Sequence, residues 1–186
     1  MKEGVVYSGS FNPFHIGHLA IVDELSKRFD YVLLVVTVQN PFKNEGENNF
    51  HERLTNVKTI IEKKGYTNVF VEDIEFYLKS PYYTINTLLA LEDKYPNDLL
   101  SYSIGADSLI GFEKWKSWEE IVESFGLVVF PREGYNHQDA IQYLKQQSDD
   151  TEFWHLIVLD CKIPMVSSTE IREKIKNGED VSNLLP

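Results

Sequence analysis

Short apolar runs alternate along the chain with longer segments in which apolar residues recur at helical spacing. The apolar runs have the length of β-strands. They lie at residues 5–8, 31–36, 69–74, 99–104, 126–130 and 153–159. The helical segments lie at residues 17–29, 52–64, 84–94, 117–125, 137–147 and 169–176. The pattern predicts that strands and helices alternate through the whole sequence.

Such alternation is typical of a parallel sheet that is covered by helices on both faces. We therefore predict an α/β protein with a Rossmann-like, doubly wound parallel sheet. No internal repeat, low-complexity tract or linker interrupts the pattern, so residues 1–186 are expected to form a single domain. Right-handed crossovers in such a sheet place loops and ligands at the carboxyl ends of the strands.

The charge of the chain restricts its partners. Eighteen basic and 29 acidic residues give a formal net charge of -11. This field repels polyanions, so nucleic acid is not expected as a partner. The same field repels a nucleotide. A nucleotide site would therefore need local help from helix N-termini, a few basic side chains and a divalent metal.

Neither a membrane nor an oxidising compartment is indicated. The apolar runs are too short to cross a bilayer, and the N-terminus lacks the apolar stretch of a signal peptide. Cys161 is the only cysteine, which excludes an intrachain disulfide. We expect a cytoplasmic protein that has no membrane partner. The sequence leaves open whether it forms a homo-oligomer.

The segment GSFNPFHIGH at residues 9–18 follows the first predicted strand and leads into the first predicted helix. Free backbone N–H groups collect at such a junction and bind phosphate. His15 and His18 are three residues apart, so both imidazoles can donate to phosphoryl oxygens on one side. Gly9 and Gly17 would let a nucleotide approach the backbone. The alternative is an ordinary turn with two solvated histidines.

The segment MVSSTEIREKI at residues 165–175 begins the last predicted helix. Ser167 and Glu170 have the spacing of a capping box, so a well-capped helix is one reading. Ser168, Thr169 and Arg172 would also place two hydroxyls and a guanidinium near a helix N-terminus. That arrangement suits the outer phosphates of a triphosphate.

Together these segments resemble the nucleotidyltransferase superfamily and, within it, the nicotinate-nucleotide adenylyltransferase family. GSFNPFHIGHL is similar to the family's G-x-F-[DN]-P-x-H-x-G-H-L, and VSSTEIR resembles its S-[SA]-T-x-I-R segment. Between them, YYTINTL, IGADSL, the tryptophan of EKWKSWEEI and FPREGY resemble further family motifs in the same order. The resemblance extends from residue 5 to the end of the printed sequence.

The resemblance implies an enzyme that transfers the adenylyl group of ATP to nicotinic acid mononucleotide. The products are deamido-NAD and pyrophosphate. Its implied catalytic residues are His18 and His15 at the α-phosphate and its neighbouring oxygens, with Lys43 and Arg172 at the departing pyrophosphate. Mg²⁺ would arrive with ATP and be held mainly by its phosphates, so no metal-ligating residues are assigned.

The resemblance also implies a set of binding residues. Those for ATP are Gly9, Ser10, Phe11, Gly17, Gly105, Asp107, Arg132, Ser168 and Thr169. Those for the acceptor are Thr84, Trp115 and Lys116, the last as a candidate cation for the ring carboxylate. From spacing alone, four of these residues have structural alternatives. Asp107 and Thr84 could cap helices, Trp115 could be a core residue, and Arg132 could be an exposed loop arginine.

Two departures from the family pattern fall on the acceptor side. Phe42 stands where a histidine is usual, and Lys116 stands where an aromatic residue is frequent. Transfer to another phosphorylated acceptor, nicotinamide mononucleotide or phosphopantetheine, therefore remains an alternative, as does a nucleotide-binding protein without turnover. An aminoacyl-tRNA synthetase is disfavoured, because the late segment reads VSSTEIR where a lysine-rich loop would be expected.

Overall fold

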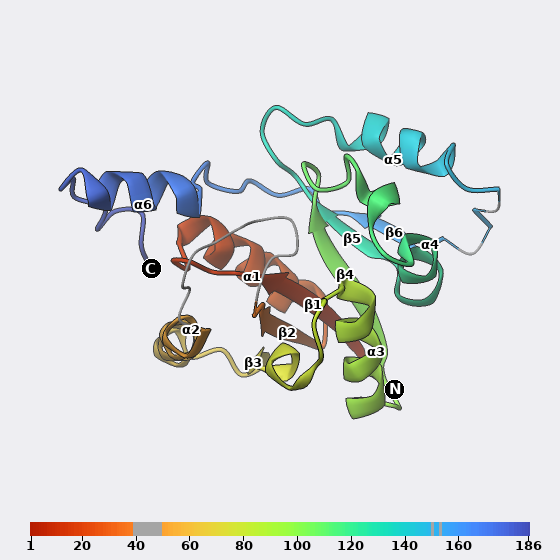
Figure 1. Cartoon of the computed structure of the whole chain (residues 1–186), viewed down its shortest axis with the longest axis horizontal. Coiled ribbons are helices and arrows are strands. Elements are labelled where there is room, and N and C mark those ends of the chain that lie inside the picture. The colour runs from red at the N-terminus through yellow and green to blue at the C-terminus, as the bar shows by residue number, and fades with distance from the viewer. Residues whose placement is uncertain (39–49, 150, 153) are drawn as a thin grey trace.

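The computed structural model describes residues 1–38, 50–149, 151, 152 and 154–186, and shows one parallel sheet (Figure 1). Its strands are β1 (Glu3–Gly9), β2 (Tyr31–Val36), β3 (Val69–Glu72), β4 (Leu99–Gly105), β5 (Leu127–Phe130) and β6 (Leu156–Val158). They lie in the order β3-β2-β1-β4-β5-β6, and every neighbouring pair is parallel. The order reverses between β1 and β4, so this is the topological switch point at which open α/β sheets bind ligands.

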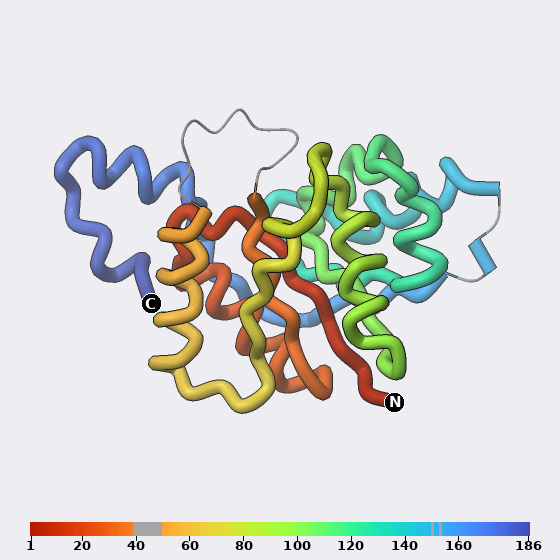
Figure 2. The backbone as a smooth tube through the Cα atoms, turned by 60° about the horizontal axis from the view of Figure 1, so that its bottom comes forward, coloured from red at the N-terminus to blue at the C-terminus, as the bar shows by residue number. Residues whose placement is uncertain are grey.

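Helices cover both faces of this sheet, as the sequence predicts (Figure 2). The α-helices are α1 (Ile16–Arg28), α2 (Phe50–Lys64), α3 (Thr84–Lys94), α4 (Trp118–Glu120), α5 (His137–Lys145) and α6 (Ser168–Lys176). Two short 3₁₀ helices, η1 (Ile74–Tyr77) and η2 (Phe112–Lys114), and a π-helix, η3 (Ile121–Phe125), complete the described elements. The prediction of a single-domain, doubly wound parallel sheet is confirmed.

The alternation of side chains along each strand explains the two layers. On β1, Val5 and Tyr7 join the apolar residues of α1 and α2, whereas Val6 joins those of α3, η3 and α5 on the opposite face. All residues of β2 are buried, because both faces of this strand are covered. The apolar runs of the sequence are therefore nearly continuous in the sheet centre, as parallel strands require.

The structure corrects three predicted boundaries. Residues 117–125 form the short helix α4 and the π-helix η3 instead of one α-helix, and Gly126 N–H donates to the Ile121 carbonyl across the π-turn at 3.1 Å. The strand predicted at 69–74 ends at Glu72, where η1 follows. Only Leu156–Val158 of the last predicted strand is assigned to β6, an edge strand that is largely exposed.

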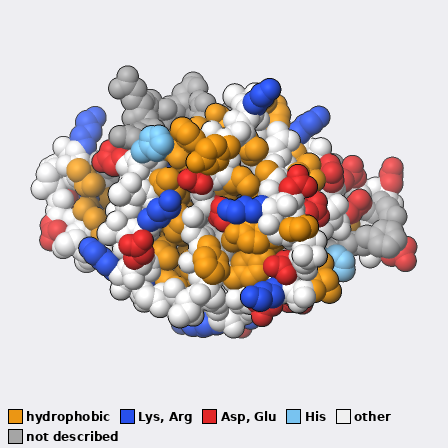
Figure 3. Space-filling view, turned by 90° about the horizontal axis from the view of Figure 1, so that it is seen from below, with side chains coloured by type: hydrophobic (Ala, Val, Ile, Leu, Met, Phe, Trp, Pro, Cys, Tyr) orange, Lys and Arg blue, Asp and Glu red, His pale blue; other side chains and the backbone are white. Residues whose placement is uncertain are grey.

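The molecular surface mixes apolar and charged side chains. Figure 3 shows one face on which apolar side chains occupy the centre and acidic side chains gather toward one end. No helix in the described part of the chain is long and apolar enough to cross a membrane.

Candidate functional site

A cavity of about 600 Å³ opens at the carboxyl ends of β1 and β4, at the switch point of the sheet. The turn after β1, the residues after β4 and β5, and the start of α6 contribute to its walls. Most residues expected to bind ATP or to act in catalysis line it: Gly9, Ser10, Phe11, His15, His18, Gly105, Asp107, Arg132, Ser168, Thr169 and Arg172. Segments far apart in the sequence thus meet in one place.

The turn between β1 and α1 is held in an unusual backbone conformation. Phe11 has a φ of 49°, in the left-handed region that non-glycine residues rarely adopt, and its side chain is buried. Such a conformation costs on the order of 1–3 kcal/mol and persists only when the surroundings enforce it. The Phe11 ring packs against Phe14 at 5.4 Å and His18 at 5.0 Å between ring centroids. The turn is therefore shaped to present the two histidines.

The two histidines form a reciprocal cap at the N-terminus of α1. His15 is the N-cap, and its Nδ1 accepts hydrogen bonds from the N–H groups of Gly17 at 3.1 Å and His18 at 3.3 Å. The Nδ1 of His18 accepts from the His15 N–H at 3.2 Å, and the rings stack with centroids 3.6 Å apart. This is a capping box built from imidazoles. Gly17 leaves room for this arrangement, because a Cβ would lie 3.0 Å from His15 Cε1 and 3.2 Å from the Pro164 carbonyl oxygen and would press on the capping ring.

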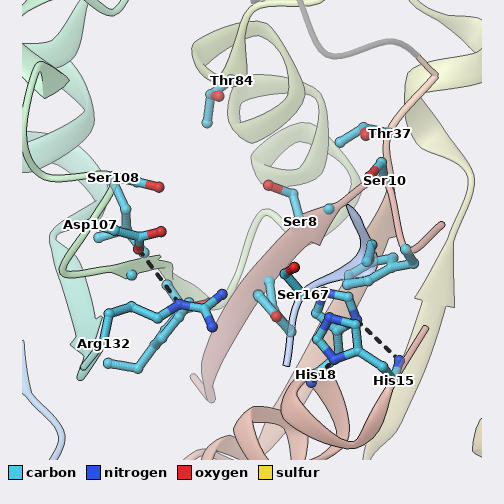
Figure 4. Close-up of a pocket in the computed structure, with 18 of the residues that line it drawn as sticks. Ser8, Ser10, His15, His18, Thr37, Thr84, Asp107, Ser108, Arg132 and Ser167 are labelled. Carbon is cyan, nitrogen blue, oxygen red and sulfur yellow. Dashed lines mark hydrogen bonds and ion pairs between the residues drawn. The ribbon is translucent and has the colours of Figure 1, made fainter. Parts of the chain in front are cut away.

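This geometry fixes the protonation of both rings. An Nδ1 that accepts a backbone N–H carries no proton, so the neutral ring bears its proton on Nε2. Burial is the main cause that lowers the pKa of His15 to about 4, and burial together with His15 lowers the pKa of His18 well below its usual value. Both rings are therefore neutral at pH 7, with their Nε2–H groups as donors. Figure 4 shows the two rings beside each other among the residues that line the cavity.

The start of α6 is docked on the histidine-bearing turn. Ser168 Oγ donates to the Pro13 carbonyl at 3.0 Å, and Arg172 Nη1 donates to the Asn12 carbonyl at 2.6 Å. The predicted capping box is half confirmed, because Ser167 Oγ accepts from the Glu170 N–H at 3.1 Å while the Glu170 carboxylate pairs with Lys174. Arg172 Nη2 also donates to Thr169 Oγ1 at 3.1 Å, so the guanidinium lies directly at the helix start.

The opposite wall of the cavity carries an ion pair. Arg132 Nε lies 3.6 Å from Asp107 Oδ1, and the guanidinium lies over the Phe130 ring (Figure 4). A Cβ at Gly105 would overlap the Asp107 carboxylate and lie 3.0 Å from Phe130 Cε2, so glycine leaves room for the carboxylate in this ion pair. The reading of Asp107 as a helix cap is wrong, because the following residues form turns and η2 begins only at Phe112.

The candidate acceptor residues are only partly brought together. Thr84 and Trp115 line the cavity, and Trp115 packs on Phe112 at 5.0 Å while remaining half-buried. Thr84 is the first residue of α3 and is not its cap, which is Tyr83. Lys116 is exposed and is not among the described residues that line the cavity, and Lys43 lies outside the described residues.

Sequence reasoning missed several polar residues of the cavity: Ser8, Thr37, Glu75, Thr87 and Ser108. Ser8 and Thr37 lie at the carboxyl ends of two predicted strands, so the rule for ligand position in such sheets could have found them. Glu75 and Thr87 come from η1 and α3. Thr87 belongs to the segment YYTINTL, whose resemblance to a family motif supplied Thr84, so that motif could have found it. No motif or periodicity in the sequence indicates that η1 faces the cavity.

Comparison with known proteins gives a consistent result. The family model described as cytidylyltransferase-like matches residues 6–174. A probable nicotinate-nucleotide adenylyltransferase of Flavobacterium psychrophilum is 37% identical, and the match covers 100% of this chain and 92% of that protein. A protein of the same description from Bacteroides fragilis is 38% identical, with 99% and 87% covered.

A solved structure shares the fold. It is that of the Plasmodium falciparum nicotinic acid mononucleotide adenylyltransferase complexed with NaAD, with a TM-score of 0.77 and 20% sequence identity. The match covers 98% of this chain and 88% of that one. The sheet order, the histidine-bearing turn and the docked last helix thus occur in a chain that resembles these proteins over nearly all of its length.

Proposed function

The chain belongs to the cytidylyltransferase-like family and, within it, to the nicotinate-nucleotide adenylyltransferases, and we propose that it transfers the adenylyl group of ATP to nicotinic acid mononucleotide. The products are deamido-NAD and pyrophosphate, a step of NAD biosynthesis. The observation that carries this proposal is the pair of neutral imidazoles, held with their Nε2–H donors at a ligand cavity at the sheet switch point.

The reaction needs positioning rather than a protein nucleophile. An oxygen of the acceptor's 5'-phosphate attacks the α-phosphorus of ATP, and the bond from that phosphorus to the bridging oxygen breaks with its electron pair leaving on pyrophosphate. His18 Nε2–H would donate to the α-phosphoryl oxygen, where charge develops, and His15 to the neighbouring bridging oxygen. A neutral donor suits this place, because it stabilises the transition state without holding the product as an ion pair.

The remaining residues would bind the two ends of ATP. Arg172, together with Lys43, would neutralise the pyrophosphate, and the hydroxyls of Ser168 and Thr169 lie beside that position. At the nucleoside end, Asp107 would accept from a ribose hydroxyl while Arg132 flanks the adenine. Their ion pair sets the orientation of both side chains before ATP binds.

Mg²⁺ would enter with the phosphates. In the described part of the chain, no group of three or more His, Cys, Asp or Glu side chains could hold a metal ion. Ser10, Thr169 and Glu170 line the cavity, and oxygen donors of these kinds fit an ion that takes most of its ligands from phosphate and water. When bound, the ion neutralises phosphate charge. Because the substrates are metabolites of the cell interior, we propose the cytoplasm as the location.

The test is a panel of acceptors incubated with the protein, ATP and Mg²⁺, with pyrophosphate release as the measurement. Nicotinic acid mononucleotide should be used about ten- to a hundred-fold better in kcat/KM than nicotinamide mononucleotide, because charge-assisted bonds to the ring carboxylate are lost with the amide. Since Lys116 is exposed outside the cavity, backbone N–H groups are the expected donors. Equal kcat/KM for the two mononucleotides would contradict the selectivity. Activity only with phosphopantetheine would contradict the assigned acceptor.

A further inference from the structure

Two buried residues of opposite charge flank the carboxyl end of β2. Arg53 is on α2 and is 6% exposed, and Glu75 is on η1 and is 4% exposed. Arginine and glutamate are almost never buried this completely unless their charges and hydrogen-bonding groups are matched. The reaction described above assigns a role to neither side chain.

Arg53 joins the chain segments that follow two neighbouring strands. Its Nη1 donates to the Ser10 carbonyl at 2.6 Å and to the Thr37 carbonyl at 2.9 Å, and its Nη2 donates to the Val38 carbonyl at 3.3 Å. Ser10 follows β1 and immediately precedes Phe11, the residue in the left-handed conformation. One guanidinium therefore fixes both the start of the histidine-bearing turn and the end of β2.

Glu75 binds the segment that follows β2, as Arg53 does, but through the backbone N–H of Val38. Its Oε2 accepts the Val38 N–H at 3.0 Å, and its Oε1 accepts the Thr87 hydroxyl at 3.0 Å. Val38 is thus bound at its N–H by Glu75 and at its carbonyl by Arg53. Burial raises the pKa of Glu75, while the bonds from Val38 and Thr87 and the charge of Arg53 partly offset this effect.

These contacts connect the elements that surround one side of the cavity. Thr87 is on α3, one turn after Thr84, and both line the cavity together with Ser10, Thr37 and Glu75 itself. Figure 4 shows Thr37 and Ser10 together on one side of the cavity, Asp107 and Arg132 on the other, and Thr84 at the edge between them. The Glu75 carboxylate is the link between α3 and the end of β2.

We propose that Glu75 and Arg53 are positioning residues that set the acceptor side of the site. They hold Ser10, which the family resemblance assigns to ATP, together with Thr37 and Val38 in register with Thr84 of the acceptor side, so that the acceptor phosphate meets the α-phosphorus of ATP in line. The proposal rests on the proposed adenylyl transfer. Misplacement by about 1 Å can cost on the order of a hundred-fold in rate, so a contact remote from the chemistry is sufficient to matter.

The test compares two substitutions at Glu75. Glu75→Ala removes both bonds and should lower kcat/KM for the acceptor by about ten-fold or more, while KM for ATP changes by less than about three-fold. Glu75→Gln should stay within about three-fold of the wild type. Its amide oxygen can accept the Val38 N–H, and its NH₂ can donate to the Thr87 oxygen. A Gln variant as impaired as the Ala variant would overturn the hydrogen-bond account.

Glu72 provides a matched control. It is also a buried glutamate, 6% exposed, but its carboxylate binds Lys94 at 2.6 Å and Tyr95 at 2.7 Å, and it is not among the described residues that line the cavity. Glu72→Ala should lower the melting temperature as Glu75→Ala does and leave kcat/KM for the acceptor within about three-fold. An equal loss of activity in both variants would reduce Glu75 to a stability role and overturn the proposal.

Amide hydrogen exchange separates this proposal from the assigned reaction. In Glu75→Ala, the Val38 amide should exchange at least about ten-fold faster, whereas in Glu72→Ala it should keep its protection. This measurement needs no substrate. A wild-type protein that is inactive with nicotinic acid mononucleotide would contradict the proposed function, and unchanged Val38 exchange in Glu75→Ala would overturn the positioning role by itself.

Discussion

At position 18, one imidazole has a separate task at each ring nitrogen. Nδ1 accepts the His15 N–H and closes the cap of α1, which leaves the proton on Nε2 at the cavity. The ring is thus a structural acceptor and a candidate catalytic donor at once. Substitutions that keep one nitrogen's function and remove the other's can distinguish the two tasks.

We predict that His18→Asn lowers kcat by on the order of a hundred-fold or more while the fold is kept. The Asn side-chain oxygen can replace Nδ1 as the cap, but no atom reaches the position of Nε2, so a transition-state donor is lost. His18→Gln should have the opposite effects: compared with His18→Asn, it should have a weaker cap, a lower melting temperature and a smaller loss of kcat. Steady-state kinetics and thermal melts measure both effects. Wild-type turnover by folded His18→Asn would contradict the assigned role.

At this scale the sequence predicts residue types better than their contacts. His15, His18, Ser168 and Arg172 were found from local motifs, because a motif is a short stretch whose geometry is set by its own turn or helix start. Their mutual capping and their bonds to the carbonyls of residues 12 and 13 were not predictable, since they depend on how distant segments pack. Lys116 shows the same limit, because adjacency to Trp115 does not set the direction of its side chain.

At the scale of elements, α6 and the residues after it are docked on the start of α1. Besides the bonds from Ser168 and Arg172, the Ile16 N–H donates to the Leu184 carbonyl at 3.1 Å. Ile16 is the first residue of α1, and its N–H has no partner inside the helix. The segment after α6 therefore satisfies a helix N-terminus beside the histidines.

We predict that Ile16→Pro releases this segment and leaves α1 intact. Proline is tolerated at the first helical position, and the extended conformation of His15, with φ -137° and ψ 174°, suits a residue before proline. Loss of one hydrogen bond of about 1 kcal/mol should lower the melting temperature by about 2–4 °C. Proteolysis within residues 177–186 should accelerate. Ile16→Val keeps the N–H and serves as the control; equal behaviour of the two variants would contradict the docking role.

Most of the helices and strands could be predicted from the sequence, because each kind of element leaves its own pattern of apolar residues. Strands buried on both faces leave continuous apolar runs, and amphipathic helices leave a period of about 3.6 residues, so both signals survive in a single sequence. Residues 117–125 carry the helical signal but contain a π-turn, whose residues Ile121, Val122 and Phe125 are buried in the core. Hydrophobic spacing alone does not distinguish that turn from an α-helix.

At the scale of the whole molecule, a net charge of -11 opposes the binding of two anionic substrates. Arg132 and Arg172 line the cavity beside two helix N-termini, and of the acidic residues in the described lining Asp107 pairs with Arg132 and Glu170 pairs with Lys174, whereas Glu75 and Glu133 add negative charge. Exposed charges farther apart than a Debye length of about 8 Å are largely screened at physiological ionic strength. Local charges at the cavity should therefore outweigh the net charge of the surface.

A pair of charge reversals on α6 tests this balance. Arg172→Glu and Lys176→Glu each change the net charge by two units, but Arg172 lines the cavity whereas Lys176 is exposed at the far end of the same helix. We predict that Arg172→Glu lowers kcat/KM for ATP by on the order of a hundred-fold or more, because an anion replaces the cation at the position proposed for the pyrophosphate. Lys176→Glu should change it by less than about three-fold at 0.15 M salt, since its field is screened. The measurement is kcat/KM for ATP at low and physiological salt. Equal losses in the two variants would mean that the net charge of the molecule governs ATP use, and that the triphosphate does not lie at the start of α6.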